Sequence, residues 1–153
     1  MTLITLGTQK QPFTRLMYAI ENSDLNGKII AQVGPNKYKS SKIEMFSYID
    51  YEKMNEYVEK ADLIITHGGT GSIIGALKKD KKIIACARLK KHDEMVDDHQ
   101  LEIVNNFAED GYILELSEDG NLNELLKEIK TFKPNKFKSN RENFIKKIIK
   151  KIE

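Results

Sequence analysis

The sequence has 153 residues, enough for one domain with a single hydrophobic core. Its 25 basic and 23 acidic residues leave a formal net charge of +2, and this balance argues against nucleic acid as a partner. With Cys86 as the only cysteine, no signal-peptide pattern and no apolar run near the ~20 residues of a membrane span, we expect a protein of a reducing compartment such as the cytoplasm.

Strand-like apolar runs alternate with segments of helical periodicity. In chain order we predict a strand at Thr2–Leu6, a helix at Phe13–Asn22, strands at Lys28–Val33 and Ile43–Ile49, a helix at Tyr51–Ala61, a strand at Asp62–Thr66, a helix from about Thr70 to Lys79, a strand at Lys82–Ala87, a helix from Asp97 or Asp98 to a cap at Gly111, a strand at Tyr112–Leu116 and a helix at Asn121–Phe132. This alternation predicts a Rossmann-like α/β fold, with a mostly parallel sheet and helices on both faces.

The last part of the chain is predicted to be separate from this domain, which would comprise residues 1–133. After Pro134, the segment Asn140–Ile152 has apolar residues at helical spacing with lysines between them, the pattern of a basic amphipathic helix. The lysines are compatible with an anionic membrane surface. Because the apolar face lacks tryptophan, we favour packing on the domain or on a partner subunit.

The segment "THGGTGS", Thr66–Ser72, stands between a predicted buried strand and a predicted helix. Its glycines allow the backbone to come close to a ligand, and the helix that follows offers free N–H groups and a positive dipole end, which suit a phosphate. The spacing is neither that of a P-loop nor that of a Rossmann fingerprint, in which Gly75 would arrive one residue late. The alternative is a tight turn whose glycines only provide clearance.

Two further segments have competing interpretations. Lys90–Gln100, "KKHDEMVDDHQ", is rich in metal-ligand residue types, but His92 and His99 are not i, i+4 partners, so we expect no metal and no cofactor there. Asp97 or Asp98 is better explained as a helix cap. Cys86 is expected to be a buried strand residue rather than a nucleophile.

The runs "ITLGT", "ADLIITHGGTGSIIGAL" and "DDHQLEIVNNFAEDGYIL" together resemble the C-terminal, donor-binding half of glycosyltransferase family 28, which is half of a GT-B fold. Within that family the chain is most similar to the stand-alone donor-binding subunits of split UDP-sugar transferases of bacterial capsule and exopolysaccharide synthesis. These have a soluble counterpart in the eukaryotic dolichol pathway.

The resemblance implies a set of donor-binding residues. The donor diphosphate would be held by His67, Gly68, Gly69, Thr70, Gly71 and Ser72, the donor sugar by Asp98, His99 and Gln100, and Gly7 and Thr8 would line the same cleft. Gln100 would make the direct contact with sugar hydroxyls. The sequence departs from the family at Gly75, where a glutamate that holds the ribose is common.

The resemblance also implies a function. The chain would be half of an enzyme that moves a hexose of galactose, glucuronic acid or N-acetylglucosamine type from a UDP-sugar to a lipid-linked glycan. A membrane-anchored partner resembling the N-terminal half would bind the acceptor and recruit the chain to the inner face of the membrane. No residue is an obvious general base. The alternative is a non-catalytic nucleotide- or phosphosugar-binding regulatory subunit.

Overall fold

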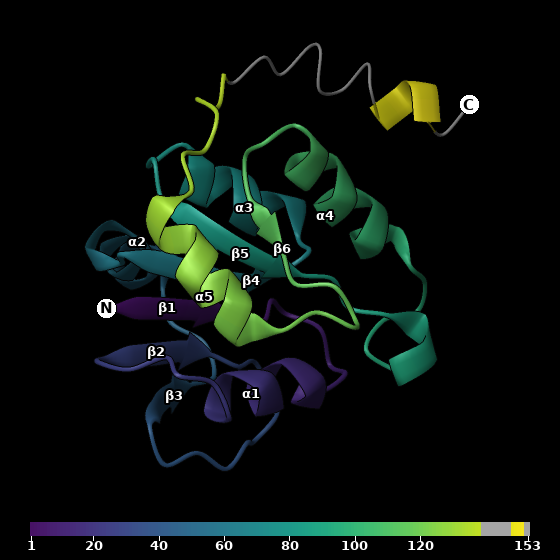
Figure 1. Ribbon diagram of the computed structural model, residues 1–153. Helices are drawn as coiled ribbons and strands as arrows, with labels where there is room; N and C mark the ends of the chain where they lie inside the picture. The colour runs from purple at the N-terminus through teal and green to yellow at the C-terminus, as the bar shows by residue number, and fades with distance from the viewer. Residues whose placement is uncertain (139–147, 152–153) are drawn as a thin grey trace.

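The computed structural model describes residues 1–138 and 148–151. The strands form a six-stranded sheet in the order β3-β2-β1-β4-β5-β6, in which every neighbouring pair is parallel (Figure 1). They are β1 (Thr2–Thr5), β2 (Ile29–Gln32), β3 (Ile43–Phe46), β4 (Leu63–His67), β5 (Lys82–Cys86) and β6 (Leu114–Glu115). The predicted Rossmann-like parallel sheet is confirmed.

Helices cover both faces of this sheet (Figure 1). They are α1 (Thr14–Glu21), α2 (Tyr51–Lys60), α3 (Thr70–Leu77), α4 (His99–Glu109) and α5 (Leu122–Thr131), with a short 3-10 turn at Lys90–His92. Helices α1 and α5 pack on the face that contains Ile65, and α2, α3 and α4 pack on the face that contains Ile64. Successive side chains of a strand point to opposite faces, so β4 contributes to both halves of the core.

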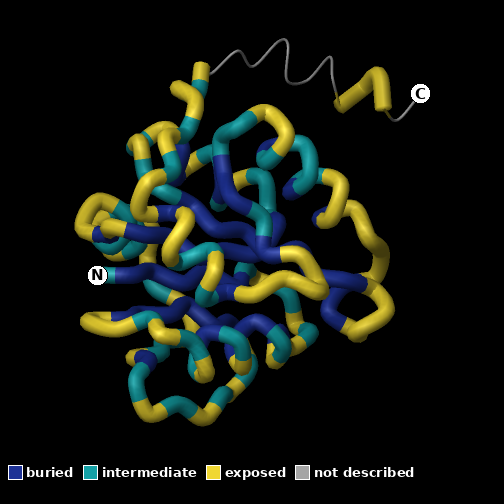
Figure 2. The backbone as a smooth tube through the Cα atoms, in the orientation of Figure 1, coloured by how far each residue is buried: buried dark blue, intermediate teal, exposed yellow. Residues whose placement is uncertain are grey.

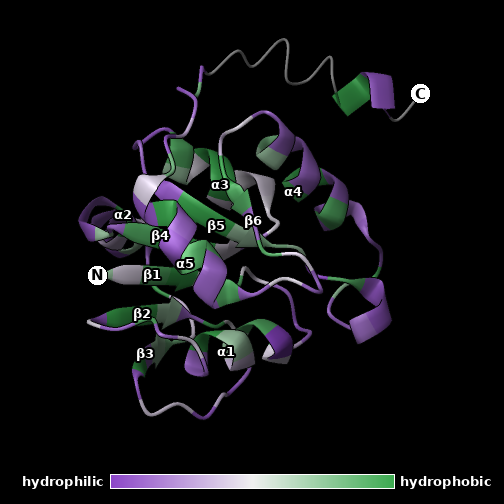
Figure 3. Cartoon of the chain, viewed as in Figure 1, coloured by the Kyte–Doolittle hydropathy of each residue, from purple (hydrophilic) through white to green (hydrophobic). Residues whose placement is uncertain are grey.

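The central strands are buried along their whole length. Every residue of β1, β2 and β4 is buried, and Figure 2 shows these strands as the dark centre of the molecule. Because helices cover both faces, such strands have no side that faces solvent, and most of their residues are apolar. Figure 3 shows the resulting contrast between hydrophobic strands and helices that carry a hydrophilic outer side.

The elements predicted up to residue 132 are found in the predicted order, with shifted ends. The third strand ends at Phe46 rather than Ile49. Two helices begin at side-chain caps, where Asp50 accepts a hydrogen bond from the N–H of Lys53 at 2.7 Å and Asn121 accepts one from the N–H of Glu124 at 3.3 Å.

Helix α4 begins where it was predicted to begin, but its capping bond differs from the prediction. Asp98 occupies the N-cap position but makes no capping hydrogen bond to α4, and its carboxylate instead accepts from the N–H of Lys90 at 2.9 Å. Asp97 accepts from the N–H of His99 at 3.1 Å. The other end of the helix is as predicted, because Gly111 has a φ of 76° and follows the last helical turn.

The predicted last helix, 140–152, lies mainly outside the described residues, so the division of the chain at residue 133 stays a prediction. Residues 148–151 are helical, and Lys151 Nζ donates to Asn106 Oδ1 of α4 at 2.5 Å. Among the helices of residues 1–138 and 148–151, none is long and apolar enough to cross a membrane.

Candidate donor-binding site

Buried polar side chains gather at the carboxyl edge of the sheet. Within the described residues, the buried polar or charged residues other than Thr2 are Thr5, Gln32, Thr66, His67, Arg88, Glu94 and Gln100. They lie at the carboxyl ends of β1, β2 and β4, or in the loop and first helical turn that follow β5. Burying a polar group costs free energy unless it is hydrogen-bonded. This edge is therefore where a functional site is to be sought.

The edge also contains the switch point of the sheet, because the strand order reverses between β1 and β4. Gly7 follows β1 with a φ of 78°, and a Cβ atom added to it would lie 2.7 Å from Cε1 of His67 at the end of β4. Arg88, which follows β5, donates from Nη2 to the carbonyl oxygen of Leu6 at 2.7 Å. The loops that follow β1, β4 and β5 therefore meet at this edge.

The ring of His67 lies between two glycines. A Cβ atom added to Gly69 would lie 2.2 Å from Cε1 of His67, closer than any side chain tolerates. Gly7, in the loop after β1, lies against the same ring. His67 is only 8% exposed. Burial, and secondarily the positive charge of Arg88, lower the pKa of His67 to about 4. The imidazole is therefore neutral at pH 7.

Helix α3 begins three residues after this histidine. Gly69 is its N-cap residue, and no side chain caps this end of the helix. Thr70, Gly71 and Ser72 form the first turn, whose N–H groups have no acceptor within the helix. Ser72 Oγ lies 3.5 Å from His67 Nε2. The predicted diphosphate-binding residues are thus brought together around the positive end of a helix, an arrangement that suits an anion.

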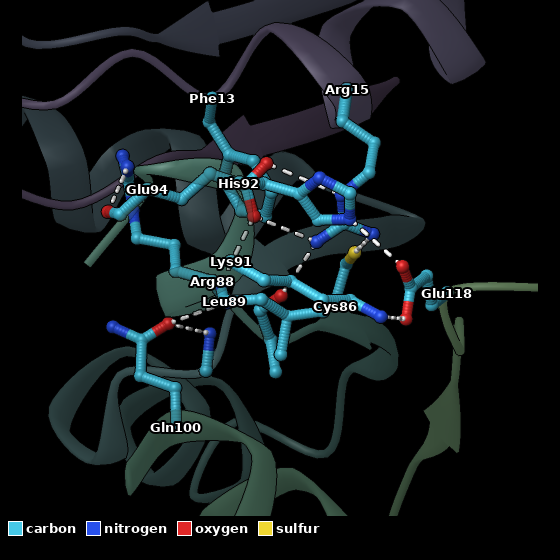
Figure 4. Close-up of polar contacts among 12 residues, drawn as sticks. Phe13, Arg15, Cys86, Arg88, Leu89, Lys91, His92, Glu94, Gln100 and Glu118 are labelled. Atoms are coloured by element: carbon cyan, nitrogen blue, oxygen red, sulfur yellow. Dashed lines mark hydrogen bonds and ion pairs between the residues drawn. The ribbon is translucent and has the colours of Figure 1, made fainter. Parts of the chain in front are cut away.

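Gln100, the predicted sugar contact, faces the interior instead. Its side chain is 3% exposed and lies against Gly68, where an added Cβ atom would be 2.8 Å from Gln100 Cβ. Its Oε1 accepts from the N–H group of Arg88 at 3.1 Å (Figure 4) and from that of Gly68 at 3.0 Å. Its Nε2 lies 3.3 Å from His67 Nδ1. Both ends of the amide have partners within the protein, so the structure assigns this side chain to the support of the loop.

The other predicted sugar contacts lie outside this cluster. His99 and Asp98 are exposed at the start of α4, and the imidazole of His99 is hydrogen-bonded to the carboxylate of Asp97. This bond is the main cause that lowers the pKa of Asp97. Thr8 is exposed in the loop after β1. Their contact with a donor sugar stays a prediction.

A buried arginine that the sequence analysis did not single out ties the loops together. Arg88 is 1% exposed, and Nη1 donates to the carbonyl oxygens of Gln11 at 2.9 Å and Glu94 at 3.2 Å. The guanidinium carbon lies 4.7 Å from the ring centroid of Phe13, within cation–π range. One sequence signal was available: Arg88 continues a buried apolar strand with no turn residue between them.

An ion pair extends this network to α1 (Figure 4). The carboxylate of Glu94, 2% exposed, accepts from Arg15 Nη2 at 2.8 Å and Nε at 3.2 Å, and from the N–H of Leu89 at 3.0 Å. Arg15 Nη2 also donates to the carbonyl oxygen of Ala87 at 2.9 Å. A bidentate pair of this kind fixes orientation as well as distance. The loop after β5 is therefore held rigidly against α1.

The remaining candidates have structural explanations. Cys86 is buried, and burial raises the pKa of its thiol to about 11, so a thiolate nucleophile is disfavoured at pH 7. His92 pairs with Glu118 rather than with His99. Within the described residues, no three His, Cys, Asp or Glu side chains are grouped to hold a metal ion.

Solved structures share the fold of this chain. The Rossmann-like sheet matches the C-terminal domains of GT-B glycosyltransferases. The crystal structure of Acinetobacter baumannii MurG aligns with a TM-score of 0.57 and 18% identity over 84% of this chain and 41% of that chain. The NMR solution structure of ALG13 aligns with a TM-score of 0.63 and 20% identity over 94% of this chain and 92% of that chain.

The chain belongs to the glycosyltransferase family 28 C-terminal domain family, whose match spans residues 1–152. It is 38% identical over 81 residues to the UDP-N-acetylglucosamine transferase subunit ALG13 of Candida albicans. That alignment covers 53% of this chain and 26% of the relative, so the chain matches about a quarter of the relative's length.

Proposed function

We propose that this chain is the donor-binding subunit of a heteromeric glycosyltransferase that takes a hexose from a UDP-sugar. Family membership supports a transferase role, and the similarity to an N-acetylglucosamine transferase subunit makes UDP-N-acetylglucosamine the first donor to test, before the galactose and glucuronic acid donors. The observation that carries the proposal is the uncapped N-terminus of α3, with His67 and Ser72 beside it.

This arrangement suits stabilisation of a departing diphosphate. When the bond to the sugar breaks, negative charge grows on UDP, and preorganised N–H groups and a helix dipole can stabilise it without a metal ion. Each such contact contributes roughly 0.3–1 kcal/mol at an exposed site and more where water is excluded. The neutral imidazole of His67 adds a hydrogen-bonding group without adding charge.

The reaction also needs groups that we assign to a second subunit. A base must take the proton of the acceptor hydroxyl, and water must be kept from hydrolysing the donor. We propose that a membrane-anchored subunit, resembling the N-terminal half of complete family members, supplies both and binds a lipid-linked glycan acceptor. The chain would then be cytoplasmic and recruited to the inner face of the membrane, in capsule or exopolysaccharide synthesis or a related glycan pathway.

One observation favours the alternative of a non-catalytic nucleotide- or phosphosugar-binding regulatory subunit. Gly75 stands on the exposed side of α3 at the position where family members commonly have the glutamate that holds the ribose. Without a carboxylate there, recognition of the ribose is weakened. A subunit that binds UDP but never supports transfer would fit this second candidate.

Two measurements test the proposal. Calorimetric titration should show that UDP and a UDP-hexose bind more tightly than ADP, with the partner subunit present. Transfer to a lipid-linked acceptor should require both subunits. Equal affinity for all nucleotides would contradict the donor site, and UDP binding without transfer by the complex would favour the regulatory role. Full activity of the isolated chain would refute the two-subunit scheme.

A further inference from the structure

The hydrogen bonds of Gln100 identify the two ends of its amide. One end receives the backbone N–H groups of Gly68 at 3.0 Å and Arg88 at 3.1 Å. A backbone N–H can only donate, so this end must be the carbonyl oxygen. The amide nitrogen is consequently the end that faces His67 Nδ1 at 3.3 Å.

The orientation of the amide determines where His67 carries its proton. An amide NH2 group donates and does not accept, so Nδ1 must be the unprotonated nitrogen of the ring. A neutral imidazole has one proton, which therefore resides on Nε2. That atom lies 3.5 Å from Ser72 Oγ, at the first turn of α3. The ring thus presents an N–H group to the open end of the helix.

Among the described residues, no group around the ring favours a proton on Nδ1 of His67. The charged group that acts on His67 is the guanidinium of Arg88, whose positive charge opposes protonation of the ring. Gly7 and Gly69 lie against the ring from either loop and bring no side chain. The partner of Nδ1 within the described residues is thus the amide of Gln100.

We propose that Gln100 is a positioning residue that holds His67 as the Nε2–H tautomer, so that the imidazole donates a hydrogen bond to a diphosphate oxygen beside the N-terminus of α3. The role in diphosphate binding rests on the proposed function, whereas the tautomer does not. In the other tautomer a lone pair on Nε2 would face the phosphate oxygen and repel it. In the held tautomer Nε2 has no lone pair for a proton, so His67 is not the base that activates the acceptor.

The tautomer can be measured directly on the full chain. The sequence has three histidines, so long-range 1H–15N correlation spectra of 15N-labelled protein give few signals, and His92→Gln and His99→Gln variants assign them. We expect the pattern of a neutral ring protonated on Nε2 for His67 at pH 7. A wild-type spectrum of the Nδ1–H tautomer would overturn the proposal without any variant at the site.

The Gln100→Glu variant then tests the cause. A glutamate of the same shape can still accept from Gly68 and Arg88, but its carboxylate offers no donor and draws a proton to Nδ1. We expect His67 to change to the Nδ1–H form, with a roughly tenfold fall in the affinity for UDP, or to the doubly protonated form, whose retained Nε2–H leaves that affinity undiminished. Leu101→Glu, which adds the same charge on the adjacent exposed position, should change neither.

The outcomes separate the two proposals. If the wild-type ring carries its proton on Nε2 but UDP does not bind even with the partner subunit, the donor site fails and the tautomer assignment stands. If UDP binds and the ring of a folded Gln100→Glu variant keeps its proton on Nε2 alone, the positioning role fails and the donor site stands.

Discussion

The loop between β4 and α3 and the helix that follows contain two kinds of glycine. At Gly68 and Gly69 an added Cβ atom would meet Gln100 and His67 at 2.8 and 2.2 Å. At Gly71 and Gly75, among the described residues, nothing lies within 4 Å of the added atom. The first pair provides clearance for packing inside the protein, and the second pair leaves open surface. Clearance within a tight turn therefore explains Gly68 and Gly69, whereas approach of a ligand is open at Gly71 and Gly75.

The packed part of the loop should make the protein sensitive to acid. The pKa of His67 is about 4 in the folded state against an ordinary value of 6.5, so between these values the unfolded state binds the proton and the folded state does not. Stability should rise with pH across this window and be lost as pH falls from about 6.5 to about 4, by up to about 3 kcal/mol.

Urea unfolding at a series of pH values measures this loss. The His67→Gln variant is the matched control, because every other titrating group is retained, and the difference between the two curves isolates the histidine. Parallel curves from pH 7 to pH 4 would show that the buried ring contributes nothing to the acid sensitivity.

Substitution within the packed pair should also destabilise the fold. Gly69→Ala leaves the backbone unstrained, since φ −75° and ψ 125° are open to alanine, but the methyl group must displace the ring of His67. Overpacking of this kind costs roughly 1–3 kcal/mol. Gly71→Ala, two residues on, should not lower the urea midpoint. Equal midpoints for the two variants would remove the distinction between packed and open glycines.

The open position Gly75 should accept a carboxylate. Gly75→Glu is expected to raise the affinity for UDP by about fivefold, or roughly 1 kcal/mol, because the new side chain can hydrogen-bond the ribose. If the charge of the carboxylate is needed, Gly75→Gln should give no gain in affinity. Neither variant should gain affinity for 2′,3′-dideoxyuridine diphosphate, which lacks the ribose hydroxyls. Calorimetry gives the affinities. A gain that survives loss of both ribose hydroxyls would place the nucleotide elsewhere.

The smallest expected effect concerns stability at the same position. Gly75 is in the interior of α3 and exposed, so Gly75→Ala should stabilise the protein by about 0.5–1 kcal/mol through helix propensity alone. Thermal or urea unfolding at neutral pH measures it. A loss of stability would mean that another group occupies the position of the added methyl group in solution.

Much of the fold could be predicted from periodicity and from glycine positions, whereas the polar network could not. Arg15 and Glu94 are far apart in the sequence, and no local pattern indicates that two charged residues will pair inside the protein. Long-range pairs of this kind follow from the topology, which fixes which loops meet.

The inward direction of Gln100 was within reach of the sequence. Val104 and Phe107 follow it by four and seven residues, which is the spacing of one helix face, and all three side chains are buried. The resemblance to a sugar-contacting segment concerns the chemistry of the glutamine and not its place on the helix. Helical phase and residue type have to be read together.

The central position of β1 has a consequence for synthesis of the chain. Thr2 pairs with Ile29 of β2 on one side and with Leu63 of β4 on the other. As the polypeptide leaves the ribosome, one edge of this strand stays unpaired until the "LIITH" segment of β4 has emerged. An apolar strand with a free edge is prone to aggregate, and parallel pairing over such a distance is slow. Nascent chains stalled before Leu63 should therefore depend on chaperones far more than chains released after it.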